Sequence, residues 1–82
     1  MPAGWYVIAY TFNGAEQAAI RVAAIAKKNP ALHPKIVAPG GHRPYLIALG
    51  GPMSRPDAVA LQRRARESGL PRDTFVRNYK GN

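Results

Sequence analysis

Residues 5–12 have the sequence WYVIAYTF, and residues 45–49 have the sequence YLIAL. Both stretches combine aromatic and aliphatic residues in the way that favours β-strands. Each is followed by a pattern typical of a helix start, at residues 13–16 and again at residues 54–57. Residues 50–52, Gly-Gly-Pro, are expected to end the second strand. The chain therefore predicts two consecutive strand–helix units.

The segment after the first strand predicts a helix over residues 15–28, because it is rich in alanine and contains no proline. Asn13 is expected to cap this helix, and Pro30 to stop it. Residues 32–38 predict a poorer strand. Pro34 cannot donate a hydrogen bond to a neighbouring strand, so this strand is expected at the edge of the sheet.

A second helix is expected after Ser54, which can accept a hydrogen bond from the first helical turn. Gly69 is expected to end it, and residues 73–79 to form the last strand. The predicted buried stripe of this helix is Ala58, Leu61 and Ala65, and its predicted solvent face is Gln62, Arg63, Arg64 and Arg66.

The element order is β-α-β-β-α-β, which predicts an α+β fold. We expect a ferredoxin-like sandwich: a four-stranded antiparallel sheet with two helices on one face. The predicted organisation is a disordered or linker start at residues 1–4, one domain at residues 5–80 and a tail at residues 81–82.

The charge balance favours an anionic partner. The 82 residues include 12 Lys or Arg but only 4 Asp or Glu, giving a net charge of +8. Nucleic acid, a membrane surface or an acidic polymer would suit such a surface, and solubility alone is the alternative. The chain has no cysteine, which excludes disulfides and thiolate metal sites. No apolar run approaches the length of a membrane span.

The sheet face opposite the helices is the candidate interaction surface. Side chains alternate between the faces of a strand, so an apolar patch rimmed by cations is expected there. The residues expected on this face are Tyr6, Ile8, Tyr10, Lys35, Val37, Leu46, Ala48, Phe75, Arg77 and Tyr79. Binding of a ligand and coverage by a second copy or by a parent protein are both compatible with such a face.

Residues 5–12, followed by Asn13 and by Gln17-Ala18, resemble the first strand and helix start of SPOR domains. Residues 45–51, followed by residues 54–58, resemble the third strand and second helix start of that family, and residues 69–76 also fit. The resemblance implies a ferredoxin-like fold without catalysis that binds peptidoglycan glycan strands stripped of their stem peptides. It also implies an extracytoplasmic place in the cell envelope, within a larger protein often concerned with cell division.

The resemblance and the sheet face together give the candidate ligand-binding residues. The resemblance contributes residues 11–13, at the end of the first strand and in the loop after it, and Arg55 after the third strand. The complete set is Tyr6, Ile8, Tyr10, Thr11, Phe12, Asn13, Lys35, Leu46, Arg55, Phe75 and Arg77.

Catalytic and metal chemistry is not predicted. His33 and His42 are separated in sequence and have no cysteine or carboxylate beside them, so a metal site is not expected. The four acidic residues have helix-start, helix-pairing or strand-start explanations, and no cofactor motif is present. The chain is therefore expected to be a binding module and not an enzyme.

Two other functions remain open from the sequence. One is a regulatory protein-interaction or dimerisation module that uses the apolar sheet face. The other is an RNA-binding module, because RRM domains share this order of elements and display aromatic residues on the sheet. Tyr6 and Tyr10 would supply those aromatics here.

Overall fold

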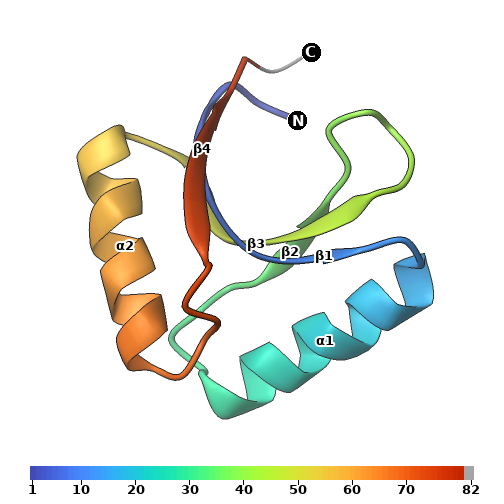
Figure 1. The fold of residues 1–82 in the computed structure, drawn as a ribbon, viewed down its shortest axis with the longest axis horizontal. Helices are drawn as coiled ribbons and strands as arrows, with labels where there is room; N and C mark the ends of the chain where they lie inside the picture. The colour runs from blue at the N-terminus through green and yellow to red at the C-terminus, as the bar shows by residue number, and fades with distance from the viewer. Residues whose placement is uncertain (81–82) are drawn as a thin grey trace.

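The computed structural model describes residues 1–80, and the tail predicted at residues 81–82 lies outside the described part. The elements in chain order are β1 (Gly4–Phe12), α1 (Ala15–Lys28), β2 (Lys35–Val37), β3 (Tyr45–Met53), α2 (Arg55–Glu67) and β4 (Phe75–Tyr79). The strands form one antiparallel sheet in the order β2-β3-β1-β4, with both helices on one side (Figure 1). The predicted ferredoxin-like α+β fold is confirmed.

β1 lies at the centre of the sheet and bends within it. It pairs with β3 from Trp5 to Phe12, but with β4 only from Gly4 to Ile8. The register against β3 shifts between Ile8 and Tyr10, which is the signature of a β-bulge. Figure 1 shows the first half of β1 running beside β4 and the second half turning away toward α1. The bulge changes which face the later residues of β1 occupy.

α1 has the predicted bounds but not the predicted cap. Its N-cap is Gly14 in an extended conformation, and no side chain caps it. The helix thus starts one residue later than an Asn13 cap requires, and the prediction for Asn13 is wrong. Ala18 and Ile25 are the buried residues of this helix.

α2 begins and ends as expected. The backbone N–H of Asp57 donates to the Ser54 hydroxyl (3.3 Å), which confirms the N-cap. At the other end Gly69 has φ +90°, and the N–H of Leu70 donates to the carbonyl of Ala65 (3.0 Å). This arrangement is a Schellman motif, and it turns the Leu70 side chain into the core.

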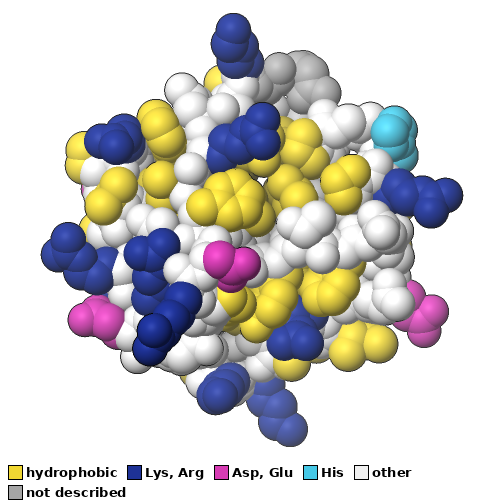
Figure 2. All heavy atoms as spheres, in the orientation of Figure 1, with side chains coloured by type: hydrophobic (Ala, Val, Ile, Leu, Met, Phe, Trp, Pro, Cys, Tyr) yellow, Lys and Arg dark blue, Asp and Glu magenta, His cyan; other side chains and the backbone are white. Residues whose placement is uncertain are grey.

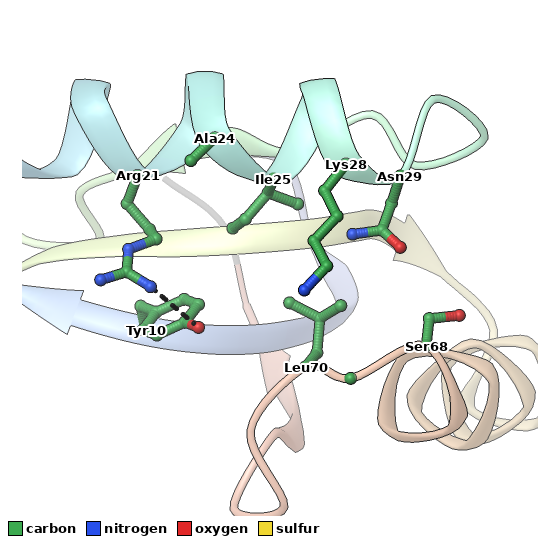
Figure 3. A pocket seen from close by; sticks show the side chains of 9 residues that line it. Tyr10, Arg21, Ala24, Ile25, Lys28, Asn29, Ser68 and Leu70 are labelled. Atoms are coloured by element: carbon green, nitrogen blue, oxygen red, sulfur yellow. Dashed lines mark hydrogen bonds between the residues drawn. The ribbon is translucent and has the colours of Figure 1, made fainter.

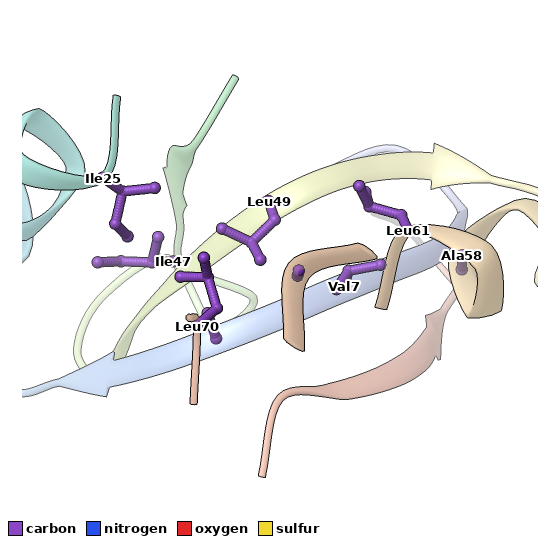
Figure 4. Packing of buried hydrophobic residues seen from close by; sticks show 9 residues of the cluster. Val7, Ile25, Ile47, Leu49, Ala58, Leu61 and Leu70 are labelled. Carbon is purple, nitrogen blue, oxygen red and sulfur yellow. The ribbon is translucent and has the colours of Figure 1, made fainter. Parts of the chain in front are cut away.

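The helix-side core joins both helices to the two central strands. Figure 4 shows Ile25 of α1 and Leu61 of α2 converging on β3, with Leu70 filling the space between them. The buried members of this core are Val7, Ala9, Ile25, Ile47, Leu49, Ala58, Leu61, Ala65 and Leu70. The predicted buried stripe of α2 is confirmed.

β3 continues through the segment that was expected to end it. Gly50, Gly51 and Pro52 all belong to the strand, and Met53 pairs with Trp5. Gly51 permits this because its φ of +129° is one that residues with a side chain rarely adopt. The short strand β2 lies at the sheet edge, as Pro34 predicts.

Thr74 organises the approach to β4. It is a fully buried polar residue, and its backbone carbonyl accepts from Gln62 Nε2 (2.8 Å) and Arg66 Nη2 (2.9 Å). Gln62 and Arg66 were expected to face solvent, and Arg66 is exposed whereas Gln62 is half-buried. Both side chains also tie α2 to the start of β4, because the carbonyl before this short edge strand needs donors.

Candidate functional site: a groove between the β2–β3 loop and β4

A groove with a volume of about 390 Å³ lies on the sheet face opposite the helices. One wall is the loop between β2 and β3, and the other is the outer face of β4. Figure 2 shows hydrophobic side chains across the middle of the view, along and beside β4, with lysine and arginine side chains around them. The groove is lined by Thr11, Pro39, Gly40, His42, Arg43, Pro44, Leu46, Phe75, Arg77 and Tyr79.

Alternation along β4 builds the first wall. Phe75, Arg77 and Tyr79 share the outer face, whereas Val76 packs against the helix-side core. Phe75 is 40% exposed, which is unusual for a large apolar side chain. The guanidinium carbon of Arg77 lies 5.2 Å from the centroid of the Tyr79 ring, so the ring helps to hold the cation in place.

The β2–β3 loop builds the second wall. Gly41 turns the chain with φ +80°, and its N–H donates to the carbonyl of Ala38 (2.9 Å). Proline at positions 39 and 44 restricts the backbone on either side of the turn. The loop thereby presents Arg43 and its neighbour His42 to the groove.

The floor is more closed than the sequence predicts. Tyr6, Ile8 and Leu46 face away from the helices as expected, but all three are buried. Met1 and Tyr79 pack against them, and the Tyr6 hydroxyl donates to the carbonyl of Pro2 (2.6 Å). Leu46 still lines the groove, whereas Tyr6 and Ile8 lie beneath the surface.

Tyr10 and Phe12 lie on the helix side of the sheet, so the prediction that Tyr10 faces away from the helices is wrong. Arg21 of α1 donates to the Tyr10 hydroxyl (3.2 Å), and its guanidinium carbon is 4.6 Å from the centre of the ring (Figure 3). The rings of Tyr10 and Phe12 are stacked with centroids 6.0 Å apart. The bulge after Ile8 causes this reversal, since it shifts the alternation by one residue.

The other predicted residues do not line the groove. The Arg55 guanidinium lies 5.6 Å from the centre of the Trp5 ring, which packs with the helix-side core. Lys35 faces the expected side, but its ammonium donates to the carbonyl of Gly51 (2.9 Å). Asn13 is exposed in the loop between β1 and α1.

Four of the predicted residues therefore come together in the groove: Thr11, Leu46, Phe75 and Arg77. Sequence reasoning missed the loop wall, residues 39–44, and did not include Tyr79 among the ligand contacts. The composition Pro-Gly-Gly-His-Arg-Pro is typical of a hairpin turn. Nothing in it indicated that the turn would stand opposite β4.

Burial raises the pKa of the Tyr6 hydroxyl above its ordinary value of 10.0. The folded chain therefore keeps the Tyr6 proton at pH values where the unfolded chain has lost it. Stability from this group is fully present below about pH 10 and falls as the pH rises further.

We expect Tyr6→Phe to flatten this alkaline decline, because phenylalanine has no proton to lose. Urea unfolding midpoints measured at intervals from about pH 8 to pH 11 would test this. All other ionisable groups are the same in the two proteins, so the comparison isolates Tyr6. If the stability of the two proteins fell equally with rising pH, the alkaline decline would not be due to Tyr6.

Within residues 1–80, no group of three or more His, Cys, Asp or Glu side chains is placed to hold a metal ion. No helix in this part of the chain is long and apolar enough to cross a membrane. The fold and the groove together define a small α+β binding module with an aromatic and basic surface.

The family model for the SPOR domain matches residues 2–77. The chain belongs to the SPOR domain family, whose members are non-catalytic modules known to bind peptidoglycan and are typically extracytoplasmic. No curated protein and no solved structure matches this chain.

Proposed function

We propose that the groove between the β2–β3 loop and β4 binds peptidoglycan glycan strands that have lost their stem peptides. The module would serve this purpose in the cell envelope, as an attachment part of a larger protein with a role in cell division. The observation that carries the proposal is the exposed Phe75 ring, which lies in a groove with hydrogen-bonding groups around it.

The chemistry of the groove suits a sugar polymer. A pyranose ring presents apolar C–H groups on its faces and hydroxyls at its rim, so it stacks on an aromatic ring while donors and acceptors satisfy the rim. Phe75 offers the ring, and the Thr11 hydroxyl and the Arg77 guanidinium offer polar partners. Tyr79 extends the aromatic surface along the same strand.

The RNA-binding alternative required Tyr6 and Tyr10 on an accessible sheet face. Tyr6 is buried, and Tyr10 contacts α1 on the other side of the sheet. Self-association through the apolar face required an exposed patch, but Tyr6, Ile8, Leu46 and Ala48 are covered within a single copy. Both alternatives therefore have less support than glycan binding.

We expect Phe75→Ala to weaken binding to peptide-free peptidoglycan by about tenfold, since loss of an aromatic stacking partner typically costs on the order of 1–3 kcal/mol. The measurement is co-sedimentation of the purified domain with peptidoglycan digested by an amidase. Ile20→Ala is a matched control, because Ile20 is a 64% exposed apolar side chain on α1 and lies outside the groove.

Circular dichroism should show both variants folded, because both side chains are exposed. Absence of sedimentation for the unmodified domain at low salt would overturn the proposal. Equal binding by Phe75→Ala and Ile20→Ala would show that the groove does not take part in glycan binding.

A further inference from the structure

We infer that Arg43 and Arg77 make the groove selective for acidic glycans, by binding a carboxylate carried on the sugar. This inference rests on the proposed function and adds the charge of the ligand to it. The two arginines approach from opposite walls, Arg43 from the β2–β3 loop and Arg77 from β4.

The groove contains cations without acids to neutralise them. The four acidic residues of the chain are Glu16 in the first turn of α1, Asp57 and Glu67 in α2, and Asp73 before β4. None of them lines this groove in the part of the chain that the structure describes. Asp73 lines an adjoining pocket, but the lining of the groove itself offers a ligand carboxylate two arginines and no acid.

The two arginines suit a carboxylate in their chemistry. A guanidinium presents a planar pair of N–H groups that matches the two oxygens of a carboxylate. The Tyr79 ring lies 5.2 Å from the guanidinium carbon of Arg77 and helps to keep this cation at the groove. Lys35, by contrast, already donates to the carbonyl of Gly51 and lies outside the groove lining.

The acidity of the glycan depends on the stem peptide. In peptidoglycan the peptide is joined by an amide bond to the lactyl group of alternate sugars. Removal of the peptide leaves a free lactyl carboxylate, which is anionic at neutral pH. Recognition of that carboxylate would let the groove distinguish peptide-free strands from strands that carry stem peptides by their charge, and not only by the size of the peptide.

The test compares three soluble probes at low salt: peptide-free glycan strands, the same strands with their carboxylates converted to methylamides, and neutral chitin oligomers of similar length. We expect the unmodified domain to bind the acidic strands about tenfold more tightly than the methylamidated strands, since each exposed ion pair contributes up to about fivefold. The preference should shrink as salt is added.

The double variant Arg43→Gln, Arg77→Gln should lose this preference and bind all three probes with similar affinity. Arg63→Gln, Arg64→Gln is the matched control, because it removes the same charge from the exposed face of α2. This control should keep most of the preference, because its arginines lie on the helix side of the sheet.

Three results would overturn the inference. Equal affinity of the unmodified domain for acidic and methylamidated strands would remove carboxylate recognition and leave the proposed glycan function standing. An equal loss of preference in the control would assign the effect to net charge and not to the groove. Failure to bind any of the three probes would remove the proposed function itself.

Discussion

Gly51→Ala is expected to lower the free energy of unfolding by about 3–5 kcal/mol, because the new methyl group has no room and the backbone conformation is unfavourable for alanine. A Cβ at this position would lie 2.5 Å from Cδ2 of Tyr6 and 2.7 Å from the carbonyl oxygen of Trp5. Tyr6 is buried and the Trp5 oxygen is backbone, so neither contact is relieved by a small rotation. The φ of +129° adds conformational strain.

Gly41→Ala separates these two causes. Gly41 also has a positive φ, +80°, but no atom lies within 4 Å of a Cβ built there. Its expected cost is about 1–2 kcal/mol, from the left-handed conformation alone. Urea unfolding of the two variants measures the difference, and equal losses of stability would contradict the steric account of Gly51.

Ile47→Ala is expected to cost about 2–5 kcal/mol, the range found when a buried aliphatic side chain is truncated. Ile47 is 0% exposed at the centre of β3 and packs in the helix-side core. Figure 4 shows its side chain beside Ile25 and Leu70, so the cavity would open where α1 meets the α2–β4 connection. In a domain of this size the loss is a large share of the total stability.

Ile36→Ala is the matched control for this substitution. Ile36 is the cross-strand partner of Ile47, but it lies on the edge strand β2 and is 39% exposed. Its truncation is expected to cost less than about 1.5 kcal/mol. A urea denaturation midpoint that falls equally for both variants would contradict the burial argument, provided that the slopes of the transitions agree.

The sequence was sufficient for the elements whose signals are local. The bounds of α1 follow from its composition, and both ends of α2 follow from Ser54 and Gly69. The edge position of β2 follows from Pro34. Each of these predictions depends on hydrogen bonds within a few residues, which the sequence displays directly.

The facing of Tyr10 could not be predicted by alternation. A single extra residue in β1, between Ile8 and Tyr10, reverses every side chain that follows it. No local composition marks the bulge, because both faces of β1 carry apolar residues. The continuation of β3 through Gly51 and Pro52 was also not predicted. Glycine and proline usually end a strand, but this strand includes both of them.

The sequence predicts one wall of the candidate groove, the outer face of β4, but not the other wall. Alternation along β4 places Phe75 and Arg77 on the correct face, because one charged residue in a short strand fixes its phase. The loop wall depends on how far the sheet curves between β4 and β2. That curvature arises from long-range packing and from the bend in β1, which no single segment encodes.

The two strands at the margins of the sheet are also its shortest, with three residues in β2 and five in β4. Long exposed margins invite strands of other molecules to add to a sheet, and natural proteins avoid this by shortening them and by placing proline or lysine there. Pro34 and Lys35 stand at one of these margins. Neighbouring copies of the domain would thus have few unpaired backbone groups at their sheet edges through which to form fibrils.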